Sequence, residues 1–130
     1  MNAIDEILEH MIKVIRREAN PDKIILFGSH LRGDSGSESD IDLLIIVSGS
    51  FGPSKSRIKE IARIERALSG VPVPTDVLVY SRDEYEKWKD SPVHVINRAL
   101  AEGRVLYDVS LTPSAIFQSS LLSIHLHLNS

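Results

Sequence analysis

The sequence predicts an α/β domain in which a small mixed sheet is flanked by helices. Two aliphatic runs, residues 24–27 and 43–47, have the length of buried strands and are too short for helices. Residues 4–15 and 58–68 instead place apolar side chains at the three- and four-residue spacing of amphipathic helices. The chain has 130 residues, of which 42% are apolar and 25% charged, and this is enough material for one core.

The first half of the chain predicts one helix followed by two strands. A helix capped by Asn2 ends at Asn20-Pro21, and its apolar positions are Ile4, Ile7, Leu8, Met11, Ile12 and Ile15. A strand over residues 23–27 then ends at the turn Gly28-Ser29, and a polar connection follows over residues 30–39. Residues 41–47 have too many consecutive aliphatic side chains to alternate, so we expect a central strand covered on both faces.

The second half predicts three helices and two more strands. A helix over residues 54–69 is closed by Gly70, and Pro72 and Pro74 lead into a third strand over residues 75–80. The remaining expected elements are helices over 82–89 and 92–102 and a short edge strand over 104–107.

Composition divides the chain into a domain and a tail. We expect the domain to span residues 1–108, because residues 109–130 contain no Asp, Glu, Lys or Arg and are rich in serine and leucine. This tail is either an appended helix that packs on a partner or a poorly ordered end.

Bulk properties exclude several classes of protein. Without cysteine there is neither a disulfide framework nor a thiolate metal site. A net charge of −3 gives no electrostatic case for direct nucleic-acid binding. The acidic N-terminus is not a signal peptide, and no apolar run is long enough to span a membrane. We therefore expect a cytoplasmic protein.

Two aspartates frame the start of the predicted central strand. Asp40 and Asp42 share one face of that strand, while Ile41 between them points into the core. Like charges this close repel unless a cation lies between them, and Mg²⁺ prefers such oxygen ligands. We expect a third carboxylate from the neighbouring strand, where Asp76 opens the next apolar run. Three such carboxylates can hold two Mg²⁺ ions, which clamp the attacking and leaving oxygens of a displacement at phosphorus.

The turn after the first predicted strand has the features of a phosphate site. Gly28 lets the backbone approach a phosphate closely, and Ser29 offers a hydroxyl and an N–H group. Arg32, one turn further on, can reach the same phosphates with its planar guanidinium. Together with the carboxylates, this turn indicates a nucleotidyltransferase site.

Each of these residues also has an ordinary structural interpretation. An Asp-x-Asp pair occurs on many solvated strand edges, and Arg32 could be a surface residue that ends a turn. His10 and His94 are expected to be ordinary surface or partly buried residues. The basic side of the second long helix is expected to be solvated, with Glu60 and Glu65 as ion-pair partners of its cations: Lys55, Arg57, Lys59, Arg63 and Arg66.

The combination Gly28-Ser29, Arg32-Gly33 and Asp40-Ile41-Asp42 resembles the signature of the DNA polymerase β-type nucleotidyltransferase superfamily. The compact Gly-Ser-x-x-Arg-Gly form is similar to its minimal nucleotidyltransferase (MNT) branch, the antitoxins of HEPN/MNT toxin–antitoxin pairs. The resemblance covers residues 1–108, up to and including the segment from Glu102 to Tyr107. It implies the palm-like nucleotidyltransferase fold.

The resemblance also implies a reaction and a partner. ATP would bind through Mg²⁺ at Asp40 and Asp42, with Asp76 completing the metal site and helping to activate the acceptor hydroxyl. Gly28, Ser29 and Arg32 would hold the triphosphate. In the MNT branch the acceptor is typically a tyrosine of a HEPN-domain ribonuclease toxin, which AMP transfer silences. Such a protein acts as an antitoxin, and the sequence leaves open whether it forms a homo- or hetero-oligomer.

Two other functions remain open at this point. The same chemistry could act on a small-molecule hydroxyl, such as that of an aminoglycoside, although the chain offers no second domain to build the pocket. Alternatively, the protein could be an antitoxin that neutralises by contact alone. Retention of both carboxylates and of Gly28-Ser29 counts against this last interpretation.

Overall fold

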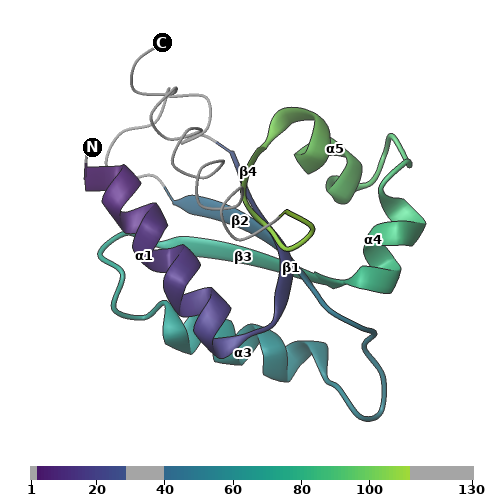
Figure 1. The fold of residues 1–130 in the computed structure, drawn as a ribbon, viewed down its shortest axis with the longest axis horizontal. Helices are drawn as coiled ribbons and strands as arrows, with labels where there is room; N and C mark the ends of the chain where they lie inside the picture. The colour runs from purple at the N-terminus through teal and green to yellow at the C-terminus, as the bar shows by residue number, and fades with distance from the viewer. Residues whose placement is uncertain (1–2, 29–39, 112–130) are drawn as a thin grey trace.

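The computed structural model describes residues 3–28 and 40–111 of the chain. Four strands form one sheet in the order β3-β2-β1-β4, and Figure 1 shows how the helices surround it. The elements in chain order are α1 (Ala3–Glu18), β1 (Pro21–Phe27), β2 (Ile41–Val47), α3 (Arg57–Ala67), β3 (Thr75–Ser81), α4 (Arg82–Trp88), α5 (Val95–Glu102) and β4 (Arg104–Asp108). Strand β1 is antiparallel to β2 and β4, whereas β2 and β3 are parallel, so the predicted mixed α/β sheet is confirmed.

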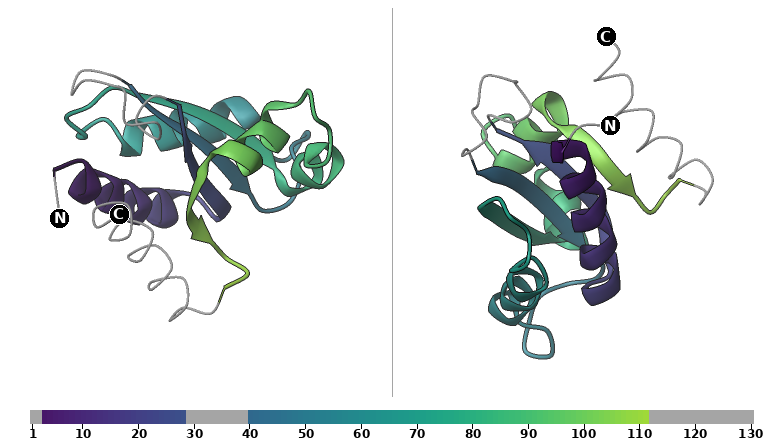
Figure 2. Two further views of the ribbon diagram at one scale, coloured as in Figure 1. Left: turned by 90° about the horizontal axis from the view of Figure 1, so that it is seen from above. Right: turned by 90° about the vertical axis from the view of Figure 1, so that its left-hand side faces the viewer.

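Helices cover both faces of the sheet. Residues of α1 and α3 pack with one set of strand side chains, and residues of α4 and α5 pack with the other set. Figure 2 shows the strands from two further directions, with these helices around them. We refer to the two sides as the α1/α3 face and the α4/α5 face. Among the helices of the described chain, none has the length and apolar character needed to cross a lipid bilayer.

Strand β2 is the central strand that the sequence predicts. Its residues Ile41, Leu43, Ile45 and Val47 belong to the core on the α1/α3 face, and Leu44 and Ile46 belong to the core on the α4/α5 face. All six are at most 1% exposed. Asp42 alternates with Leu43, so it lies on the α4/α5 face.

Two helices begin three residues later in the structure than the sequence predicts. Helix α3 begins at Arg57 rather than residue 54, because Gly52 and Lys55 form a bridged turn and Ser56 caps the helix. Helix α5 begins at Val95 rather than residue 92, because the His94 side chain accepts a hydrogen bond from the Ile96 N–H group. In both cases a capping side chain fixes the first turn more strongly than the apolar spacing does.

Sheet topology brings the chemically interesting segments to one end. Strand β1 runs towards Gly28, and its antiparallel neighbours β2 and β4 begin beside that end. Strand β3 begins there too, because it is parallel to β2. We call this the carboxylate end of the sheet. The opposite end, where β1 begins and β2 and β4 finish, carries Asp22, Lys23 and Asp108 and is called the braced end.

Candidate active site

The carboxylates of Asp42 and Asp76 come from neighbouring strands at the same height. Asp42 pairs with Asp76 in the parallel register of β2 and β3, and with Phe27 in the antiparallel register of β1 and β2. Paired residues of adjacent strands share a face and lie about 4.8 Å apart across the sheet. The structure therefore places Asp76 beside Asp42 on the α4/α5 face, as the sequence predicts.

Gly28 is held against Asp42 by geometry that no other residue type fits. Its φ angle is +86°, a region that side chains with a Cβ atom rarely adopt. A Cβ atom built on Gly28 would lie 2.1 Å from Oδ2 of Asp42. The missing side chain thus makes the space for the carboxylate, and it links the turn after β1 to the first residues of β2.

Asp40 lies at the entrance to β2 and is exposed. The next residue, Ile41, donates its N–H group to the carbonyl of Pro74 at 2.9 Å, which fixes this entrance beside β3. Ile41 is fully buried on the α1/α3 face. The same alternation directs Asp42 away from that face, towards the side of Asp76, and the expected place of Asp40 on that side stays a prediction because Asp40 precedes the strand.

Several predicted site residues lie outside the described part of the chain. Ser29 and Arg32 belong to the undescribed residues 29–39, as does the whole of the predicted polar connection over residues 30–39. Within residues 3–28 and 40–111, no three or more His, Cys, Asp or Glu side chains are grouped so that they could hold a metal ion. The oxygen donors of Asp40, Asp42 and Asp76 have the chemistry that Mg²⁺ prefers, and this ligand set stays a prediction.

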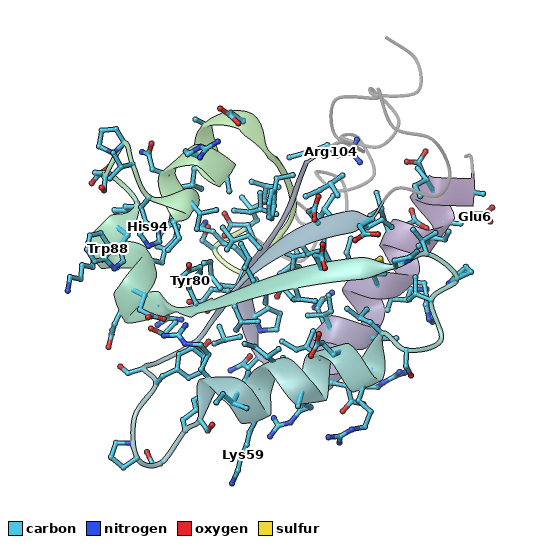
Figure 3. All side chains as sticks on the ribbon, turned by 180° about the vertical axis from the view of Figure 1, so that it is seen from behind. Glu6, Lys59, Tyr80, Trp88, His94 and Arg104 are labelled. Carbon is cyan, nitrogen blue, oxygen red and sulfur yellow. The ribbon has the colours of Figure 1, made fainter. Side chains whose placement is uncertain are left out.

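Sequence reasoning did not identify Arg104, which begins β4 at the carboxylate end and pairs with Leu26. Figure 3 shows Arg104 at the same end of the molecule as Glu6 on α1. Its Nε and Nη1 atoms are buried and have no hydrogen-bond partner among the described residues. Burial lowers the pKa of Arg104, and the buried Asp5 carboxylate of α1 opposes that shift. The sequence signal was weak, because a basic first residue of an edge strand is common on ordinary surfaces.

The prediction that the basic side of helix α3 is solvated is wrong for Arg57. Arg57 is not part of a solvated face: its Nη1 donates to the Val79 carbonyl at 2.8 Å, and its Nη2 bonds to Glu84. Its guanidinium also lies 4.7 Å from the ring centre of Phe51. The expected ion pair between Arg63 and Glu60 is present at 3.6 Å.

The two histidines noted in the sequence have the ordinary roles expected of them. His10 is exposed on α1. His94 caps α5 and stacks on Trp88 with ring centres 5.0 Å apart, and it meets Tyr80 edge-on. Figure 3 shows these three aromatic residues together, on the other side of the molecule from Arg104. They therefore belong to the packing of α4 and α5 rather than to the carboxylate end.

The sequence is similar to a nucleotidyltransferase family and to a protein adenylyltransferase. The family described as polymerase beta, nucleotidyltransferase matches residues 9–111. A provisionally named protein adenylyltransferase of Methanocaldococcus jannaschii is 38% identical over 85 residues, which cover 65% of this chain and 77% of the relative.

Solved structures show the same fold at lower identity. A crystal structure of the toxin–antitoxin pair MntA–HepT is similar with a TM-score of 0.51 and 17% identity, covering 95% of this chain and 87% of that chain. A crystal structure of a toxin–antitoxin complex with AMP-PNP gives a TM-score of 0.50 and 20% identity, with coverage of 93% and 88%.

Proposed function

This chain belongs to the polymerase β nucleotidyltransferase family, and we propose that it transfers AMP from ATP to a hydroxyl group of a partner protein. One observation carries the proposal: Asp42 lies between Gly28 and Asp76, so the glycine turn after β1 and two carboxylates meet on one face. The relative named as a protein adenylyltransferase supports AMP as the group transferred. The fold shared with a complex that contains AMP-PNP supports ATP as the donor.

The carboxylates are suited to a magnesium-dependent reaction. Asp40, Asp42 and Asp76 would hold Mg²⁺, with two ions as the expected number. When bound, Mg²⁺ neutralises phosphate charge and polarises the phosphoryl oxygens. The neighbouring register of Asp42 and Asp76 supports this assignment, because two carboxylates at this spacing on one face can share a cation.

The residues of the chain have separate roles in the proposed transfer. Gly28 lets the backbone approach the triphosphate, which Ser29 and Arg32 would hold. Asp76 is exposed, so its carboxylate can orient the acceptor hydroxyl and accept its proton. The acceptor oxygen then bonds to the α-phosphorus, the bond from that phosphorus to the bridging oxygen breaks, and pyrophosphate leaves with the bond electrons.

We further propose that the partner is a HEPN-domain ribonuclease toxin and that the acceptor is a tyrosine. The support is the fold shared with a chain of the MntA–HepT toxin–antitoxin pair. The net charge of −3 suits association with a basic, RNA-cutting partner. On this proposal the protein is an antitoxin that acts by modifying its toxin.

The proposal is tested with ATP labelled at the α-phosphate, Mg²⁺ and a HEPN-domain toxin of the source organism. Wild type should label the toxin, and Asp42→Asn should reduce the rate at least about a hundredfold, because it removes a charge directed at the reacting phosphates. Asp90→Asn is the matched control, since Asp90 is an exposed carboxylate outside the site.

The same assay separates the other candidate functions. Label on an aminoglycoside but not on the toxin would establish the small-molecule reaction. Toxin neutralisation by Asp42→Asn at the wild-type level, without any label, would establish an antitoxin that acts by contact alone.

A further inference from the structure

Strand β3 is an edge strand, and its register with β2 has no shift or bulge. It pairs with β2 through seven consecutive residues, from Ile41 with Thr75 to Val47 with Ser81. The other edge strand, β4, has only five residues, and its register with β1 shifts between Ile24 and Ile25. Regular, unprotected edges readily accept a further strand, whereas short or irregular ones resist it. Of the two edges, β3 is therefore the one suited to strand addition.

Three hydrogen bonds show which backbone groups of β3 point outward. The Pro74 carbonyl accepts from Ile41 of β2, so groups of residues 74, 76, 78 and 80 point towards β2. Groups of residues 75, 77, 79 and 81 then point to the open edge. Two contacts agree, since Arg57 donates to the Val79 carbonyl and the Ser81 N–H donates to Glu84.

These contacts occupy only the C-terminal half of the edge. Arg57 donates to the outward carbonyl of Val79, and Glu84 accepts from the outward N–H group of Ser81. In the part of the chain that the structure describes, no hydrogen bond to the outward backbone groups of Thr75 and Val77 is present. The open half of the edge is therefore the half that contains Asp76.

A hollow borders this open half on the α1/α3 face. It has a volume of about 460 Å³ and is lined by apolar side chains, including Leu68, Val71, Val73 and Val77, together with the polar residues Glu65, Ser69 and Thr75. No residue of β2 lines it, so it lies on the outer side of β3. Two half-buried side chains of β3, Thr75 and Val77, form its wall.

The opposite face of the same stretch carries the site. Asp76 is exposed there, and Leu78 is 38% exposed. A strand added at the edge would place alternate side chains on the two faces. A residue opposite Asp76 would have its Cβ about 5 Å from that of Asp76, and the residues on either side of it would enter the hollow.

We propose that the N-terminal half of β3 receives the acceptor segment of the partner protein as an added strand. The hydroxyl residue lies opposite Asp76, and apolar residues before and after it fill the hollow. This inference rests on the proposed function and specifies how the acceptor is presented. Backbone hydrogen bonds to Thr75 and Val77 supply the affinity, and the alternation of side chains supplies the specificity.

Two blocked peptides of identical composition test the alternation. Lys-Thr-Val-Tyr-Val-Thr-Lys places valines beside the tyrosine, where they would enter the hollow, and Lys-Val-Thr-Tyr-Thr-Val-Lys places threonines there. AMP transfer from labelled ATP should show a KM about tenfold lower for the first peptide, because two valines leave water. Equal KM values for the two peptides would overturn the inference.

Two substitutions test the edge and the hollow separately. Val77→Pro removes an outward N–H group without touching the ladder to β2, and Val73→Asp places a carboxylate in the hollow. Each should raise the KM for the first peptide about tenfold and leave AMP-PNP affinity unchanged. Val93→Asp is the control, because it also replaces a valine with aspartate, at a position that is 89% exposed and outside the edge. It should leave both the KM for the first peptide and the AMP-PNP affinity unchanged.

The outcomes distinguish this inference from the proposed function. If wild type binds AMP-PNP and labels the toxin, but labels neither peptide or is insensitive to both substitutions, the edge inference fails and the function stands. If wild type neither binds AMP-PNP nor labels the toxin, the proposed function fails and the edge inference fails with it. A Val77→Pro variant that does not fold leaves Val73→Asp, with its own control, as the deciding variant.

Discussion

The two ends of the sheet use the same residue type in opposite ways. At the braced end, Asp22 accepts hydrogen bonds from Arg82 at 2.5 and 2.8 Å and from Ser48 at 2.9 Å. Asp108 accepts from Lys23 at 2.6 Å. At the carboxylate end, Asp42 and Asp76 lie side by side on neighbouring strands. At the braced end, aspartates paired with cations hold strands and helices together, whereas two aspartates on one face at the carboxylate end are placed so that a cation can lie between them.

The pKa values at the braced end agree with a structural role. Hydrogen bonds from Arg82 are the main cause that lowers the pKa of Asp22, against the opposing effect of burial. For Asp108, burial raises the pKa most, but hydrogen bonds from Lys23 and Ser110 outweigh it and the net shift is downward. Both carboxylates are therefore stabilised in their charged form by folding.

Asparagine substitutions at the two ends give the largest expected contrast. Asp42→Asn should reduce AMP transfer at least about a hundredfold and leave the protein folded, because asparagine has nearly the shape of aspartate. Asp22→Asn should keep transfer within about twofold of wild type, because Asp22 lies at the opposite end of the sheet. Transfer rates and urea unfolding measure both quantities on the same samples. Equal losses of transfer in the two variants would remove the distinction between the ends.

Gly28→Ala should affect both activity and stability. The left-handed φ angle of +86° and the contact with Asp42 each oppose a Cβ atom at this position. Together they should lower the free energy of unfolding by about 3 kcal/mol. Because relief of the contact requires Asp42 to move, transfer should fall as well. Gly70→Ala is the control, since a Cβ there meets no atom within 4 Å and the φ angle is not positive. A free energy of unfolding for Gly28→Ala equal to that of wild type would contradict this account of the turn.

Asp22→Asn should lower the free energy of unfolding by about 2 kcal/mol, because it weakens hydrogen bonds between charged groups. Arg82 is half exposed, so solvent screening keeps the expected loss at this modest size. Asp83→Asn tests a neighbouring carboxylate that is exposed, and its effect should be smaller. An unchanged unfolding midpoint for Asp22→Asn would show that the braced end does not stabilise the sheet.

The same contrast explains how much of the molecule is visible in the sequence. Asp40 and Asp42 could be recognised because strand alternation is local, and Asp76 because it opens the next apolar run. Which residues lie beside them on neighbouring strands could not be predicted, since the register of Asp42 with Asp76 depends on the packed sheet. The braced end was not predicted, because Asp22 and Arg82 are 60 residues apart in sequence. Local patterns reveal elements and motifs, while long-range ion pairs depend on the finished fold.

Arg57 illustrates the same limit within a single helix. Its position among other cations at the start of α3 predicts a solvated charge. In the folded chain it instead joins the loop before α3 to β3 and α4, through Phe51, Val79 and Glu84. Each of these partners is outside the helix, so no helical periodicity could have identified them.

The smallest expected effect is the dependence of stability on pH, and it too separates the ends. Asp22 has a folded-state pKa below its ordinary value of 3.8, so its stabilising effect is fully present above that value. As pH falls below 3.8 and through the lowered folded-state pKa, the effect is lost. Urea unfolding between pH 6 and pH 3 should therefore show a larger fall in the free energy of unfolding for wild type than for Asp22→Asn, which keeps only the contribution of other carboxylates such as Asp108. Asp42→Asn should retain this fall, because it leaves the pairing of Asp22 with Arg82 in place. A fall that disappears in Asp42→Asn instead would assign the acid sensitivity to the carboxylate end and reverse the comparison.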